Sequence, residues 1–248
     1  MQLASLSVLA WVALGVGALL AGFAKTAISG VGMITVALFA AVLPSRESTG
    51  TLLLLLLVGD MVAVSAYRKD VEWRTLARLA PSVVAGVLAG VAFVLLATDQ
   101  VLRRTIGVVI LVLLAVHLWR QRRAKDRAPS TPGRVVTIGA GSLAGFTSMV
   151  ANAGGSVMAV YLLGARLEMR AFLGTGAWFF FAVNLFKLPF TVALGLVSGS
   201  SLVILVVTAP LVLLGTFVGR RVIDRIDREL FEKLVLGFTL LAALNLLR

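Results

Sequence analysis

The sequence has no cysteine, a single histidine and few charged residues, and each scarcity excludes a class of protein. Without cysteine the chain can form neither disulfides nor thiolate metal sites. His117 is the only histidine, and no cluster of other ligands accompanies it, so we expect no metal centre and no cofactor. Charged residues make up 14% of the chain, against about 25% in soluble domains. This low charge argues against a soluble protein.

Hydrophobic residues make up 60% of the chain, and the mean hydropathy is +1.03. Apolar segments recur from end to end and leave no room for a soluble domain. The first segment lacks a basic region before it, and Lys25 lies after the apolar run. We therefore interpret it as a retained membrane helix and not as a cleaved signal peptide.

The formal net charge is +12, which could indicate a nucleic-acid partner. The cations, however, lie in short stretches between apolar runs, as the positive-inside rule describes. We expect Arg68–Arg78, Arg120–Arg134 and Arg220–Lys233 in the cytoplasm and the uncharged turn Pro189–Ser200 outside. The pattern predicts a multi-pass protein of the cell's inner (plasma) membrane, in contact with lipid and not with nucleic acid.

The fold class that we predict is an all-α polytopic membrane bundle with about eight to ten segments, since a spanning helix needs about 20 apolar residues. The first set of candidate segments is Leu3–Phe23, Ile28–Leu43, Ser48–Tyr67, Leu79–Ala97 and Arg104–Trp119. The second set is Val135–Val150, Gly154–Leu163, Ala171–Leu188, Ser201–Gly219 and Leu230–Leu247.

The two sets resemble each other, which predicts a repeat at 1–119, a basic linker at 120–134 and a second repeat at 135–248. Matching features occur in the same order: Ala21-Gly22-Phe23 with Ala144-Gly145-Phe146, Arg46 and Gly50-Thr51 with Arg170 and Gly174-Thr175, Asp60 with Asn184, and Pro81, Gly86 and Gly90 with Pro210, Gly215 and Gly219. Counting crossings favours opposite orientations of the halves, as in the inverted repeats of secondary transporters. A parallel arrangement remains open if one opening pair crosses only once.

Each half also contains an interrupted hydrophobic segment. Gly154–Leu163 would rise only about 15 Å as a helix, against a hydrocarbon core of about 30 Å. The glycines and asparagine of Ser148–Gly155 disfavour an uninterrupted helix, and Gly22–Gly32 has the same character. We predict two broken or re-entrant helices, although the opening pairs 3–43 and 135–164 could also span fully. Interrupted segments in corresponding positions indicate a transport site.

Ionisable residues inside apolar runs are the main candidates for function, because each costs about 2.5–3.5 kcal/mol to insert. A buried Lys25, with backbone amides at a broken helix end, could attract an anion; alternatively it extends to the interface. Asp60 could accept a proton, or neutralise Lys25 or Lys187, or serve as a structural clamp between helices. Its counterpart Asn184 shares a helical face with Lys187.

From these features we predict an anion-binding set and a coupling or gating set. The binding set is Lys25, Thr26, Ser29, Gly30, Asn152, Gly154, Gly155, Ser156 and Thr175. The coupling or gating set is Asp60, Asn184, Lys187 and Trp178. The alternative for the second-half glycines is a packing break, and the alternative for Trp178 and the Phe179–Phe181 run is a lipid-facing or core position.

A series of motifs over nearly the whole chain resembles the sulfite exporter TauE/SafE family of membrane permeases. The first half contains GFAKTAISGVG, LPSREST, GD and YRKDVEW; the second contains GSLAGFTSMVANAGGSVMAVYLL and FLGTGAWFFFAVNLFKLPF. The resemblance implies a duplicated multi-helix permease for sulfite, sulfonates or related organosulfur anions. The first glycine-rich segment departs from the family pattern, with Thr26, Ala27, Ile28 and Ser29 where relatives often have more glycines.

Three functions are compatible with these features. The leading one is a secondary permease for a small sulfur-containing anion, with protons as possible coupling ions and a homo-oligomer as a possible state. The chain lacks a GxxxxGK[ST] phosphate loop, so we expect no ATP hydrolysis. No histidine or cysteine joins Lys25, Asp60 and Lys187, so we expect no enzyme activity. The alternatives are a non-transporting scaffold or assembly protein, for which Gly86-x-x-x-Gly90 and Gly215-x-x-x-Gly219 suit close helix contact, and, less favoured, an intramembrane enzyme built on Lys25, Asp60 and Lys187.

Overall fold

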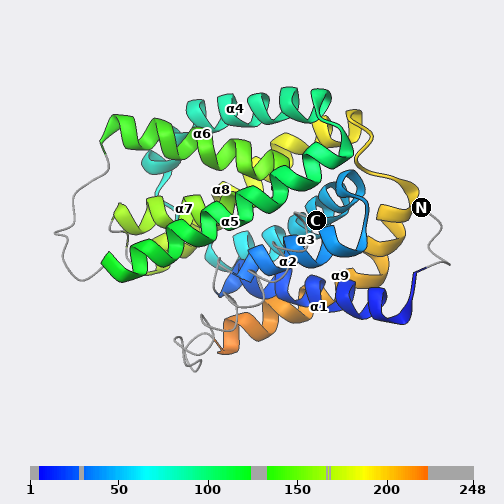
Figure 1. Ribbon diagram of the computed structural model, residues 1–248. Coiled ribbons are helices and arrows are strands. Elements are labelled where there is room, and N and C mark those ends of the chain that lie inside the picture. Colours follow the sequence, from blue (N-terminus) through cyan, green and yellow to red (C-terminus); the bar gives the residue numbers. More distant parts are fainter. Residues whose placement is uncertain (1–5, 28–30, 124–132, 166, 168, 223–248) are drawn as a thin grey trace.

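A computed structural model (Figure 1) describes residues 6–27, 31–123, 133–165, 167 and 169–222, and every regular element in these ranges is an α-helix. The helices are α1 (Val8–Thr26), α2 (Gly32–Val42), α3 (Ser45–Tyr67), α4 (Trp73–Leu96), α5 (Asp99–Arg123), α6 (Arg134–Ala151), α7 (Gly154–Gly164), α8 (Met169–Ala193) and α9 (Gly199–Val222). Six of them, namely α1, α3, α4, α6, α8 and α9, are long and apolar enough to cross a membrane. The predicted all-α membrane bundle is confirmed.

The opening helix of each half is followed by a short one. α2 and α7 have 11 residues each and therefore rise about 16 Å, roughly half the thickness of the hydrocarbon core. In Figure 1, α1 and α3 begin at the end of the molecule that holds the N-terminus, so α2 leads the chain back to that end. α6 and α8 begin at the opposite end and run the other way.

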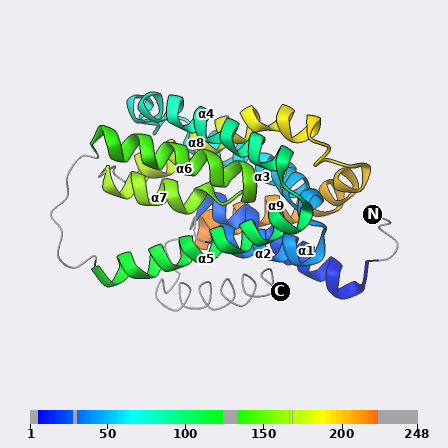
Figure 2. The ribbon, with the colours of Figure 1, turned by 45° about the horizontal axis from the view of Figure 1, so that its top comes forward.

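The most extensive contacts between helices are those of α4 with α6 and of α1 with α9. Figure 2 shows α4 and α6 side by side from a second angle. α3 and α8 also pack on each other, and together these pairs join the N-terminal helices to the C-terminal ones. Large exposed apolar residues such as Val8, Leu96 and Val206 lie on the outer surface, as expected for side chains that contact lipid.

Glycines allow these two helix pairs to approach closely. A Cβ atom on Gly22 of α1 would collide with the carbonyl of Val212 in α9, and one on Gly215 would collide with the carbonyl of Leu19. The α4–α6 pair repeats the arrangement, since Gly145 faces Val83 and Gly86 faces Ser142. The small-residue spacings of the sequence therefore serve packing within the chain.

One end of the bundle, which we name the outer end after the predicted orientation, is joined by polar contacts. Arg46 at the start of α3 forms an ion pair with Asp99 (2.8 Å) and donates to the carbonyls of Val94 (3.1 Å) and Ala97 (2.8 Å). Glu47 accepts hydrogen bonds from Ser198 (2.9 Å) and Ser200. A cation at this end is unusual for an outside loop, but Arg46 satisfies carbonyls at the end of α4, where cations are favoured.

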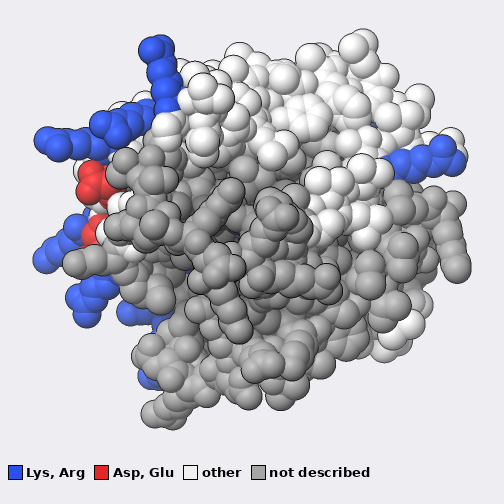
Figure 3. Space-filling view, turned by 60° about the vertical axis from the view of Figure 1, so that its left-hand side comes forward, with Lys and Arg blue, Asp and Glu red and all other residues white. Residues whose placement is uncertain are grey.

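Among the described residues, the opposite, inner end carries most of the exposed cations. Figure 3 shows lysines and arginines gathered along one edge of the molecule, with few at the opposite edge. Arg68 and Lys69 after α3, Arg74 in α4 and Arg220 and Arg221 in α9 are exposed. This distribution follows the positive-inside pattern.

Several predicted boundaries are wrong because charged or proline residues occur inside helices. α4 begins at Trp73 and includes Arg74 and Arg78, which were expected in a turn. α8 continues through Pro189 to Ala193, and α5 continues through Arg120–Arg123 of the expected linker. Polar residues at the ends of a membrane helix extend it beyond the lipid, so hydropathy alone places the ends too early. The segment Leu230–Leu247 lies outside the described residues.

The Gly22 contact generates a stability prediction. We expect Gly22→Ala to lower the stability of the purified protein by about 1–3 kcal/mol, because the methyl group forces α1 from the backbone of α9. Gly139→Ala is the matched control: it lies in α6 with open space around its Cα, so the same change removes only a poor helix former. Thermal unfolding in detergent measures both. Equal melting temperatures for Gly22→Ala and wild type would contradict the close contact.

Candidate functional site

Lys25 lies in the last turn of α1, where its positive charge is favoured by the negative end of the helix. Its side chain is 9% exposed, and its Nζ lies 2.5 Å from Oδ1 of Asp60 in α3. Gly59 makes room for this contact, since a Cβ atom there would lie 3.0 Å from Cγ of Lys25. Lys25 thus points into the protein and not into the headgroups.

Asp60 is fully buried and joins three helices. Besides the ion pair with Lys25 of α1, its Oδ2 accepts a hydrogen bond from Nδ2 of Asn184 in α8 (2.5 Å). Asp60 and Asn184, which occupy matching positions in the two halves of the sequence, therefore face each other. Of the partners considered for Asp60, the structure selects Lys25.

A sharp turn separates α6 from α7 and exposes backbone groups inside the bundle. α6 ends at Ala151, and Asn152 adopts a left-handed conformation with φ of 50°, which asparagine tolerates better than most residues. The amide of Asn152 donates to the carbonyl of Ser148 and that of Ala153 to the carbonyl of Thr147, both at 3.1 Å. α7 then begins at Gly154, so the predicted interruption is present in the second half.

Lys187 reaches this turn from α8 and is 1% exposed. Its Nζ donates to the carbonyl of Ser148 (2.7 Å), to Oγ of Ser148 (3.0 Å) and to Oδ1 of Asn152 (2.6 Å). Nδ2 of Asn152 in turn donates to the carbonyl of Thr49 in α3 (3.0 Å). The turn between α6 and α7 is thereby bound to both α8 and α3.

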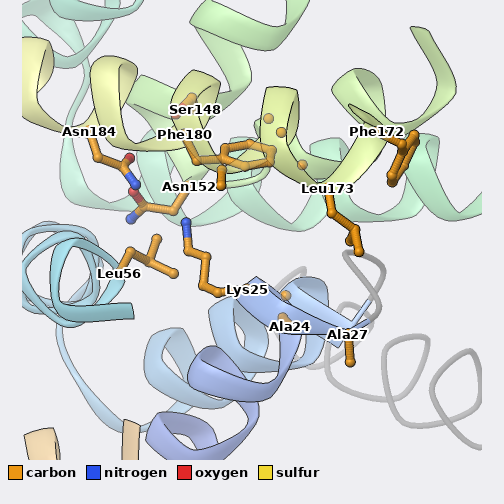
Figure 4. Close-up of a pocket in the computed structure, with 15 residues that line it drawn as sticks. Ala24, Lys25, Ala27, Leu56, Ser148, Asn152, Phe172, Leu173, Phe180 and Asn184 are labelled. Atoms are coloured by element: carbon orange, nitrogen blue, oxygen red, sulfur yellow. The ribbon is translucent and has the colours of Figure 1, made fainter. Parts of the chain in front are cut away.

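A cavity of about 70 Å³ lies between these groups, which is room for a few water molecules or a small solute. Figure 4 shows Lys25 reaching from α1 toward Asn152, Asn184 and Phe180, and its Nζ lies 4.7 Å from the centre of the Phe180 ring. Gly154 and Gly155 at the start of α7 also line the cavity. Further lining residues extend it along α8 toward the inner end, namely Phe172, Leu173, Gly176 and Ala177.

The cavity brings together part of the predicted binding set, namely Lys25, Asn152, Gly154 and Gly155, with Asn184 of the coupling set. Thr26 is instead buried against α9, where its hydroxyl donates to the carbonyl of Thr216 (2.9 Å). Thr175 accepts a hydrogen bond from the amide of Glu72 before α4 (2.9 Å). Neither threonine lines the cavity in the described part of the chain, so this geometry gives no support to a binding role.

Trp178 packs against Trp73 of α4 in a tilted arrangement, with ring centres 5.1 Å apart, and edge-to-face against Phe181 at 6.2 Å. It is not among the residues that line the cavity, so a gating role for Trp178 stays a prediction. Ser29 and Gly30 lie outside the described residues, as do the side chains of Ser156 and His117.

Several residues at the site were not predicted from the sequence. Ser148 could have been found, because the repeated Ala-Gly-Phe places it opposite Lys25. Thr49, Leu56 and Phe172 carry no signal in the sequence, since they contribute a carbonyl or an apolar surface. Among the described residues no group of three or more His, Cys, Asp or Glu side chains could hold a metal ion.

Comparison with known proteins identifies the family. A family model described as Sulfite exporter TauE/SafE matches residues 14–246, nearly the whole chain. Searches of the curated proteins and of the solved structures gave no match. The family is one of membrane permeases, which agrees with the six span-capable helices among the described residues. The chain belongs to the sulfite exporter TauE/SafE family.

Proposed function

We propose that the protein is a secondary transporter of the plasma (inner) membrane that carries a small sulfur-containing anion, such as sulfite or an organosulfonate, together with protons. The family match supports a permease for such anions. The single observation that carries the proposal is the cavity that Lys25 lines together with the first residues of α7.

The charges around the cavity favour a negative solute. Lys25 lines the cavity, and Lys187 and Asp60 lie behind its wall, so this region holds two basic side chains and one acidic one. The positive end of α7 adds a partial positive charge, because the first amides of a helix have no partners within the helix. Removed from water, such groups attract an anion more strongly than they would at the surface.

The contact between Lys25 and Asp60 suggests how protons couple to the anion. At 2.5 Å, Oδ1 of Asp60 occupies the position that an anion oxygen would take beside Nζ of Lys25. An anion and the Asp60 carboxylate therefore compete for the same ammonium group. A proton on Asp60 removes its charge and releases Lys25 for the anion, so proton and anion bind together.

The arrangement of the halves supports an inverted repeat. α1 and α3 run opposite to α6 and α8 (Figure 1). The α1–α9 and α4–α6 pairs each contain two close contacts between a glycine of one helix and the backbone of the other. Inverted repeats with interrupted helices near the membrane midplane suit alternating access, because one half can move against the other around a fixed site.

The proposal predicts that Lys25→Met abolishes anion transport. In proteoliposomes we expect sulfite flux to fall at least about tenfold, since loss of about 1.4 kcal/mol of binding already has this effect. Lys69→Met is the matched control, because Lys69 is an exposed lysine after α3 and its loss should leave flux unchanged. Flux in Lys25→Met equal to that of wild type, for sulfite and short sulfonates alike, would refute the proposed site.

The coupling mechanism predicts a different phenotype for Asp60→Asn. The amide cannot bind and release a proton at this position, so anion exchange should persist while an imposed pH gradient no longer drives accumulation. Asp70→Asn, in the turn after α3, should respond to the gradient as wild type does. The measurement is sulfite uptake with and without a pH gradient. Gradient-driven accumulation by Asp60→Asn at the wild-type level would show that the coupling proton binds elsewhere.

A further inference from the structure

Lys187 is a buried lysine whose three donors are all used. The acceptors are the carbonyl and hydroxyl of Ser148 and the side-chain oxygen of Asn152, at 2.6–3.0 Å. Three acceptors match the three N–H groups of an ammonium ion. None of the three is a carboxylate, and the ion pairs among the described residues are those of Lys25 with Asp60 and of Arg46 with Asp99.

The compensation for this charge comes from the end of a helix. Ser148 lies in the last turn of α6, which ends at Ala151. The last carbonyls of a helix lack partners within it and together resemble about half a negative charge. Lys187 donates to the carbonyl of Ser148, which also accepts from the amide of Asn152, so its ammonium group lies at the negative end of α6.

The start of α7 lies directly beside that end. Only Asn152 and Ala153 separate the two helices, and a Cβ atom on Gly154 would lie 2.7 Å from the carbonyl of Ala144 and 3.0 Å from Cβ of Ser148. The positive end of α7 thus faces the cavity within a few residues of the negative end of α6. Left uncovered, the end of α6 would repel the anion that α7 attracts.

Lys187 also fixes the shape of the turn. The backbone of Asn152 has a left-handed conformation. Its side chain accepts a hydrogen bond from Lys187 through Oδ1 and donates one to the Thr49 carbonyl through Nδ2. Asn152, Gly154 and Gly155 line the cavity, whereas Lys187 contacts it only through Ser148 and Asn152. Its effect on a bound anion would therefore pass through other residues.

We propose that Lys187 is a positioning residue of the anion site: its ammonium group covers the negative end of α6 and holds the α6–α7 turn, so that the amides of α7 can accept an anion. This inference rests on the proposed function. It gives the two lysines different roles. Lys25 is paired with the Asp60 carboxylate, which a proton can neutralise, whereas Lys187 binds groups of Ser148 and Asn152 that do not titrate.

The test is anion affinity in the purified full-length protein, measured by calorimetry with sulfite, with sulfate as a dianion and with methanesulfonate as a monoanion. We expect Lys187→Met to weaken sulfite binding at least about tenfold and to weaken sulfate binding by a larger factor than methanesulfonate binding. A role in shape alone would weaken both anions by the same factor. Lys187→Arg, which retains charge and donors, should recover most of the affinity.

Two further variants complete the design. Thr191→Val is the control: Thr191 is buried one turn further along α8 and donates only to the carbonyl of Lys187 (2.9 Å), so affinity should not change. If Lys187→Met does not fold, Lys187→Gln retains donors without charge and takes its place.

Wild-type affinity in the uncharged variant, or equal losses of affinity for sulfate and methanesulfonate, would overturn this inference and leave the proposed function intact. Absence of saturable binding of all three anions to wild type would overturn the proposed function as well.

Discussion

The structure depends on the need to compensate charges that are buried in a membrane. Asp60 is fully buried, and its ion pair with Lys25 and its hydrogen bond with Asn184 join α1, α3 and α8 at one point. Breaking such a pair leaves an isolated charge and is far more costly than losing an exposed pair. The end of α1 must therefore stay beside α3, and the chain turns back as α2 at that place.

Both opening helices end beside an ammonium group, although the two halves achieve this differently. α1 carries its own lysine in its last turn, whereas the matching position of α6 is Ser148 and the lysine comes from α8. A cation at the end of a helix offsets the partial negative charge of the last carbonyls. The shared requirement is thus electrostatic, and the halves differ in whether the lysine meets a carboxylate or neutral acceptors. That difference gives the two lysines different chemistry.

The sequence predicts those candidate site residues that carry a charge or interrupt a helix. It does not predict residues whose position depends on packing. Lys25, Asp60, Asn184 and Lys187 stand out because polar groups interrupt apolar runs. The structure joins the first three in one network and binds Lys187 to Ser148 and Asn152 in a second one. Asn152 and Gly154 stand out because they interrupt a helix. Thr26 and Thr175 could not be assigned, because hydroxyl groups in helices also bind carbonyls and amides of neighbouring helices. Helix ends were misplaced wherever charged residues continue a helix beyond the lipid.

The two ends of the bundle differ in a way that accounts for the direction of the cavity. At the outer end, a Cβ atom on Gly50 would collide with the carbonyl of Leu196, Thr51 donates to Ser201 (2.8 Å), and Glu47 binds Ser198 and Ser200. At the inner end the matching Gly174 packs on the carbonyl of Asp70, and Oγ1 of Thr175 accepts a hydrogen bond from the amide of Glu72. The residue that matches Glu47 is Ala171, however, which cannot form the polar link. The outer end is thus held by the hydrogen bonds of Glu47, for which Ala171 offers no counterpart, and the cavity extends along α8 toward the inner end.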